Sequence, residues 1–237
     1  MTETSAPNPK CDRSSQDEQT IVVKNFMAND YDPATSQPLT FTIGEVINPE
    51  STRPVDGLDI LILAKGLYAI DEFSGLTPWD LTTGSLVDVN VNPGSDDANK
   101  AENTYVISFT PKHQIPINGY VVISIPNEIK VPDPSYSSSS CKAPQPQGFP
   151  VEKITCQFKD LENNDGWYKL VILNAFRRSV GQADEAYSVE LPGIQNPIKI
   201  TTTPPFTIET FTSDAYGIDS FTGSGVTMMN AAEIQNV

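Results

Sequence analysis

Proline and glycine interrupt this 237-residue sequence so often that long helices have little room to form. The chain holds 20 prolines and 14 glycines. Proline removes a backbone hydrogen-bond donor, and glycine favours turns. Between these breaks lie short segments rich in β-branched and aromatic residues, which are typical of strands. The sequence therefore predicts an all-β protein, and 38% hydrophobic residues are enough for a substantial core.

Alternating apolar residues mark the expected strands most clearly in the middle of the chain. In ENTYVISFTP, Tyr105, Ile107 and Phe109 fall on one face, which is the period of a strand with one buried side. Asn118-Gly119 is a turn dipeptide before the next segment. The segments together indicate an antiparallel β-sandwich. They are SLVDVNV, ENTYVISFTP, YVVISIP, EKITCQF, GWYKLVILNAF, AYSVELPG and PFTIETF.

The sequence repeats itself at an offset of 148 residues, as in Tyr68 and Tyr216. LYAIDEFSG (67–75) is matched by AYGIDSFTG (215–223). Two unrelated domains that share turn residues would also give short matches. However, Asn-Pro pairs recur at the same offset, at 48–49 and 196–197, and this agreement favours a tandem repeat.

The phase of the repeat divides the chain into modules. We interpret residues 1–75 as the C-terminal half of an incomplete repeat, 76–223 as a complete repeat, and 224–237 as the start of a third. Half a sandwich would expose sheet edges and part of a core. Either the chain is a stretch of a longer repetitive polypeptide, or neighbouring molecules complete each other's modules by strand exchange.

The repeated phrase is expected at the closing edge of each module. Phe73 and Phe221 would pack across a junction there, together with the preceding tyrosines, while the glycine that follows turns the chain onward. GSGVTMMNAAE (223–233) would then serve as a linker between modules.

The three cysteines indicate in which cellular compartment the protein functions. Cys141 and Cys156 flank a loop rich in serine and proline, and a disulfide there would contribute about 3 kcal/mol by loop closure. Cys11 precedes Asn25 much as Cys156 precedes Asn174, so we expect it at the corresponding place in the incomplete repeat, with a partner upstream. A reduced thiol or a bridge between protomers is the alternative. Oxidised pairs favour an extracellular or cell-surface protein.

The charge of the chain argues against nucleic acid as a partner. The formal net charge is −15, and phosphate binding needs concentrated lysine and arginine. A diffuse acidic surface favours solubility, with divalent cations as the other interpretation. No stretch approaches the roughly 20 apolar residues of a membrane-spanning helix.

Calcium is the strongest metal hypothesis. The segment DLENNDG offers Asp160, Glu162, Asn164 and Asp165 as hard oxygen ligands, although it lacks the glycine position and the downstream glutamate of an EF-hand. A solvated hairpin turn explains the same residues. No other cofactor is indicated.

Catalytic motifs are not evident. His113, the one histidine, has no nucleophile motif around it, and we expect it to be a solvated loop residue. A pair of carboxylates acting on a glycosidic bond has no motif in its support. The sequence therefore predicts a protein without enzymatic activity.

A family resemblance agrees with this interpretation. The run TYVISFTPKHQIPINGYVVISIP, the cysteine pair, VELPGIQNP and YGIDSF together resemble a β-sandwich repeat of very large surface proteins of ciliated protists. The resemblance covers the complete repeat. It implies an immunoglobulin-like extracellular architecture with a structural or adhesive role, and its single disulfide fits Cys141 and Cys156.

We therefore expect tandem immunoglobulin-like antiparallel β-sandwich modules in a filament, coat or surface stalk. The expected partners are copies of the chain itself or adjacent repeats of the same polypeptide. The alternative is a calcium-dependent cell-adhesion or glycan-binding module that recognises surface glycans.

Overall fold

The computed structural model describes most of the chain between Lys10 and Asn230. The described residues are 10–13, 20–24, 40, 42, 44, 47–55, 57–64, 68–76, 80–131, 141–144, 149–150, 154–159, 167–223 and 225–230. Their contacts divide the chain into two compact units, Met1–Ile47 and Asn48–Val237. Strands are the only regular secondary structure in the described part, so the prediction of an all-β protein is confirmed.

The described residues of the first unit form one strand pair. β1 (Lys10–Arg13) and β2 (Ile21–Lys24) run antiparallel, and the register places Cys11 opposite Val23.

The second unit begins with a hairpin and continues into a larger structure. β3 (Leu58–Leu63) and β4 (Ala69–Leu76) form a two-stranded antiparallel sheet. The strands that follow are β5 (Gly84–Ser85), β6 (Val87–Pro93), β7 (Asn103–Thr110), β8 (Tyr120–Pro126), β9 (Thr155–Lys159), β10 (Trp167–Leu173), β11 (Tyr187–Ile194), β12 (Thr207–Phe211) and β13 (Gly217–Thr222).

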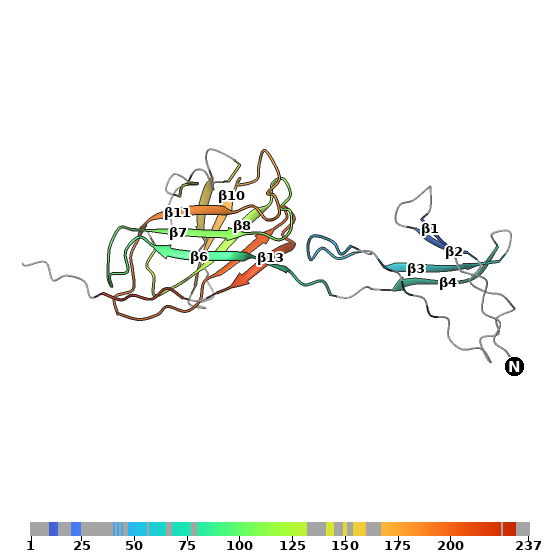
Figure 1. Ribbon diagram of the computed structural model, residues 1–237, viewed down its shortest axis with the longest axis horizontal. Coiled ribbons are helices and arrows are strands. Elements are labelled where there is room, and N and C mark those ends of the chain that lie inside the picture. Colours follow the sequence, from blue (N-terminus) through green and yellow to red (C-terminus); the bar gives the residue numbers. More distant parts are fainter. Residues whose placement is uncertain are drawn as a thin grey trace, which may run out of the picture. The chain divides into compact units, whose positions relative to one another are not determined.

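Strands β5 to β13 form two sheets that share one core, as in a β-sandwich. The larger sheet has the order β5-β13-β12-β8-β10-β9 and the smaller sheet the order β11-β7-β6. In Figure 1 the smaller sheet crosses in front of strands of the larger one. Every pairing is antiparallel except that of β13 with β5. We call this pair of sheets the sandwich.

Apolar side chains of both sheets meet in the middle of the sandwich. Ile107 of β7, Ile123 of β8 and Leu170 of β10 have no exposed surface and belong to one cluster. A group of aromatic rings packs within it, with centroids 5.3 to 6.3 Å apart, which adds favourable edge and stacking contacts. Its members are Phe109, Phe149, Phe176 and Tyr187.

The period-two pattern identifies β7 correctly. Its residues alternate between buried and half-buried along most of the strand. Asn118, in the expected turn before β8, has a φ of 65°, which asparagine tolerates better than most residues. β10, predicted to be central, lies between β8 and β9.

The repeated phrase forms strands, which differs from the expected junction. In its second copy, Gly217–Thr222 is β13 and pairs with both β12 and β5. Phe221 is partly buried and packs against the core of its own sandwich, where it lies opposite the buried Ile208 of β12. In this second copy the phenylalanine therefore stabilises the sandwich itself.

Candidate functional site

The hairpin β3–β4 repeats the backbone pairing of β12–β13 at the offset of 148 residues. Ile60 lies opposite Phe73, just as Ile208 lies opposite Phe221. In each hairpin the register shifts just before the last pair. The closing backbone hydrogen bonds also correspond: Ala64 to Tyr68 at 2.8 Å, and Thr212 to Tyr216 at 2.9 Å. Further matched pairs are Leu61–Glu72 with Glu209–Ser220, and Leu63–Ala69 with Phe211–Gly217.

The two hairpins differ in what covers them. Ile208 and Ile218 are 0% and 2% exposed, whereas their counterparts Ile60 and Ile70 are 39% and 67% exposed. Exposed apolar residues that gather on one element of this kind mark interaction surfaces. We call the exposed residues whose counterparts lie in or against the core the hairpin face. They are Leu58, Ile60, Ile70 and Phe73.

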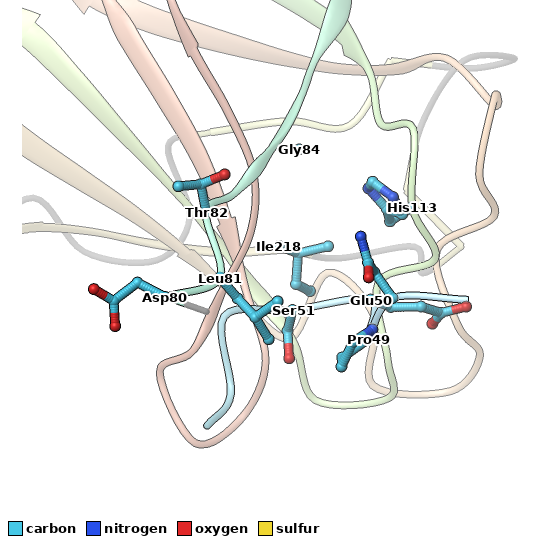
Figure 2. Close-up of a pocket in the computed structure, with 10 residues that line it drawn as sticks. Pro49, Glu50, Ser51, Asp80, Leu81, Thr82, Gly84, His113 and Ile218 are labelled. Carbon is cyan, nitrogen blue, oxygen red and sulfur yellow. The ribbon is translucent and has the colours of Figure 1, made fainter. Parts of the chain in front are cut away.

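A loop of residues 48–53 docks on the end of the sandwich. Thr52 donates its backbone N–H to the carbonyl of Gly217 at 2.7 Å, and its Oγ1 accepts the Gly217 N–H at 2.9 Å. A cavity of about 340 Å³ lies between this loop, residues 80–84 and His113. Figure 2 shows the loop side chains on one side of this cavity and His113 on another. We call residues 48–53 the docked loop.

A buried carboxylate holds the turn beside this cavity. Asp219 has no exposed surface, and its Oδ2 accepts the backbone N–H groups of Lys112 and His113, each at 2.9 Å. Its Oδ1 lies 2.7 Å from Nδ1 of His113. A Cβ at Gly84 would overlap the Asp219 carboxylate and lie 2.5 Å from the His113 ring, so this position has no room for a side chain.

This arrangement corrects the expectation that His113 is simply solvated. Its side chain is 43% exposed, but the ring is bound to Asp219, which lies 106 positions away in sequence. Hydrogen bonds to a buried charge are strong and directional. The carboxylate therefore fixes the geometry of the turn that borders the cavity.

The repeated Asn-Pro pair has a structural role at Asn196. The buried Asn196 donates to the carbonyls of Ser95 and Asp97, both at 2.8 Å. Its Oδ1 accepts from Nδ2 of Asn103 at 2.9 Å and from the hydroxyl of Tyr105 at 2.8 Å. Both amide hydrogens and the carbonyl are thus used. Burial raises the pKa of Tyr105.

The expected linker packs into the sandwich. Val226 and Met228 are buried in its core. The Val226 N–H donates to Oγ1 of Thr203, and the Met228 N–H donates to the carbonyl of Thr201. The linker interpretation of residues 223–233 is therefore wrong at Val226 and Met228, whose side chains are part of the core, although Met229, which follows Met228, is exposed.

A disulfide joins Cys141 to Cys156, with their Cα atoms 6.2 Å apart. In β9, Cys156 lies opposite Ile172 of β10, as Cys11 lies opposite Val23 in the first unit. Both cysteines thus occupy the same kind of place in a strand pair. The covalent partner of Cys11 stays a prediction.

The four calcium candidates, Asp160, Glu162, Asn164 and Asp165, lie outside the described residues. Within the described ranges, no three histidine, cysteine, aspartate or glutamate residues gather as a metal site would require. No helix in the part of the chain that the structure describes is long and apolar enough to cross a membrane.

Among the comparisons with known proteins, the one with solved structures returned a match. No protein-family model and no curated protein matches the sequence. Among solved structures, the chain is similar to a cohesin module from a family 33 glycoside hydrolase of Clostridium perfringens ATCC13124. The identity is 8%, the TM-score is 0.39, and the match covers 64% of this chain and 100% of the module.

Proposed function

We propose that this chain is part of an extracellular structural protein in which tandem immunoglobulin-like β-sandwich modules form a filament, coat or surface stalk. The observation that carries this proposal is the hairpin β3–β4, which shares three residue pairs and the shift before the last pair with β12–β13 at the offset of 148. A chain that forms the same element twice at a fixed offset is expected to form the same kind of module twice.

The docked loop supports a head-to-tail arrangement of such modules. If the chain is divided by the 148-residue repeat, residues 48–53 belong to one module and Gly217 belongs to the next. The two hydrogen bonds between Thr52 and Gly217 then join consecutive modules directly. Modules that contact mainly their neighbours form elongated assemblies, and the partners are adjacent repeats or further copies of the chain.

The disulfide supports the extracellular setting. Disulfides persist in oxidising compartments and are rare in the cytosol. The bond between Cys141 and Cys156 also closes a loop rich in serine and proline, which would otherwise cost entropy to order. A covalent link of this kind suits a protein that bears load outside the cell.

Electron microscopy and sedimentation velocity test the proposal on the same samples of the full chain. At rising concentration we expect beaded strings, with one bead per repeat, and a growing fraction of fast-sedimenting species. A compact monomer at the highest concentration would overturn the proposal. A calorimetric calcium titration distinguishes this structural role from calcium-dependent adhesion. Heat of calcium binding, together with attachment to cells that a chelator abolishes, would favour adhesion instead.

A further inference from the structure

β12 of the sandwich shows what normally lies beside such a hairpin. β12 pairs with β13 on one side and with β8 on the other. Across the second pairing, Ile208 lies opposite Ile123 and Phe211 opposite Tyr120. β8 therefore covers one edge of this hairpin with hydrogen bonds, and its side chains continue the core.

β3 pairs with β4 as β12 pairs with β13. Among the described residues, however, β3 has no second neighbouring strand of the kind that β8 provides for β12. Its sheet consists of β3 and β4 alone. One edge of β3 thus presents backbone N–H and C=O groups of the kind that pair with an added strand. This edge corresponds to the one that β8 occupies on β12.

The hairpin face indicates the chemistry of the missing strand. Leu58 and Phe73 are 59% and 55% exposed, although the counterpart of Leu58, Phe206, is buried in the core. Burying such side chains is favourable in proportion to the apolar area removed from water. A strand that lies beside β3 needs apolar side chains at alternate positions to extend this face.

An exposed carboxylate on the same hairpin also has a buried counterpart in the sandwich. Asp71 of β4 is the counterpart of Asp219, yet it is exposed and accepts only the neighbouring Glu72 N–H among the contacts of the described residues. In the sandwich, Asp219 holds the turn at Lys112 and His113, which precedes β8 in the chain. Asp71 is therefore placed to hold the corresponding turn of an incoming segment.

We propose that β3–β4 is an acceptor for one strand of the β8 type, added antiparallel to β3 in the register that β8 has on β12. The occupant is an uncharged strand from outside this 237-residue sequence, with aliphatic residues at alternate positions as in YVVISIP (120–126). This inference rests on the proposed function and specifies how one module is completed.

A labelled peptide of residues 119–127 with short Ser-Gly flanks tests the acceptor. Fluorescence anisotropy measures its binding to the full chain, and a scrambled peptide with the same flanks is the control for non-specific association. We expect saturable binding of the β8 peptide that unlabelled peptide displaces. The scrambled peptide should bind about tenfold or more weakly.

Two matched variants of β3 identify the face. Ile60→Glu should weaken peptide binding about tenfold or more, because it places a charge where the counterpart Ile208 is buried. Leu61 lies on the opposite face of β3, and its counterpart in β12 is Glu209. Leu61→Glu should therefore leave peptide binding unchanged. Equal effects of the two variants would overturn the assigned face.

Backbone methylation distinguishes strand pairing from simple hydrophobic attachment. Successive residues of a central strand direct their N–H groups to opposite neighbours. A peptide methylated on Val121 and Ile123 and a second one methylated on Val122 and Ser124 should therefore differ, with one set abolishing binding. If both peptides bind as the unmodified one does, strand addition is wrong.

Other occupants give different results. If residues 1–47 of the same chain cover β3, the peptide will not bind and the β3 amides will be protected from hydrogen exchange in the monomer. If two copies pair through β3, Ile60→Glu will abolish a dimer that the peptide cannot dissociate. Either result overturns the inference, while beaded assemblies in the microscope would leave the proposed function standing.

Discussion

At the scale of single residues, one buried carboxylate stabilises a turn far away in sequence. Asp219→Ala removes the acceptor of two backbone N–H groups and of the His113 ring. We expect the free energy of unfolding to fall by about 3 kcal/mol, because the N–H groups lose a charged partner. Denaturant unfolding of the full chain measures the change. Asp214→Ala, at an exposed turn, is the control and should stay within about 0.5 kcal/mol of the original chain.

The buried tyrosines make stability depend on alkaline pH. Burial raises the pKa of Tyr187 to about 12. Below about pH 10 the hydroxyl is protonated in both states. Between about pH 10 and 12 only the unfolded chain releases this proton, so the free energy of unfolding should fall by up to about 1.4 kcal/mol per pH unit. Denaturant unfolding at stepped pH should show a smaller slope for Tyr187→Phe. Tyr68→Phe, at an exposed position, should keep the original slope.

At the scale of elements, the two hairpins provide a comparison of burial within one chain. Ile208→Ala removes buried methyl and methylene groups from the core and should cost about 3 kcal/mol of unfolding free energy. Ile60→Ala changes the equivalent residue on the hairpin face and should cost less than about 1 kcal/mol. Thermal and denaturant unfolding of the two variants measure the difference. Similar losses would show that β3 is already covered in the monomer.

The disulfide acts on the loop between β8 and β9. Replacing both Cys141 and Cys156 by serine should lower the free energy of unfolding by about 3 kcal/mol, because the unfolded chain regains the entropy of an open loop. Urea unfolding measures this loss. The original chain in reductant is the matched control, and it should unfold at nearly the same urea concentration as the double variant. Full stability of the variant would contradict a stabilising role.

Elements with a local pattern are predictable from sequence, whereas contacts between distant segments are not. Alternation along β7 and the Asn118-Gly119 turn depend on neighbouring residues, so the sequence indicates them directly. The contact of His113 with Asp219 depends on β13 lying beside the turn, which no local pattern shows. One usable signal existed: Ile-Asp recurs in both copies of the repeated phrase. The core contacts of Val226 and Met228 are not predictable in this way, because glycine and polar residues surround these two side chains in the sequence.

At the scale of the whole molecule, the repeat predicts a second docked loop. Residues 198–200 hold the place of residues 50–52, since the offset of 148 relates Ile200 to Thr52. Ile198 and Ile200 are 64% and 59% exposed, whereas Thr52 is bonded to Gly217. Ile200 has no hydroxyl. It can therefore repeat the hydrogen bond that the Thr52 N–H donates, but not the one that the Thr52 hydroxyl accepts. Two exposed isoleucines in one loop would instead contribute apolar contact area to a following module.

Adding a module tests this joint. A chain extended after residue 237 by a second copy of residues 90–230 supplies a new β13 for the loop at 198–200. We expect the amides of this loop to exchange about tenfold or more slowly than in the original chain, because docking must open before exchange occurs. Hydrogen exchange read by mass spectrometry measures the change, and the exposed turn at Ser213 and Asp214 should be unaffected. Unchanged exchange at 198–200 would mean that modules are joined flexibly, since a docked loop cannot leave its amides as open to water as a free one.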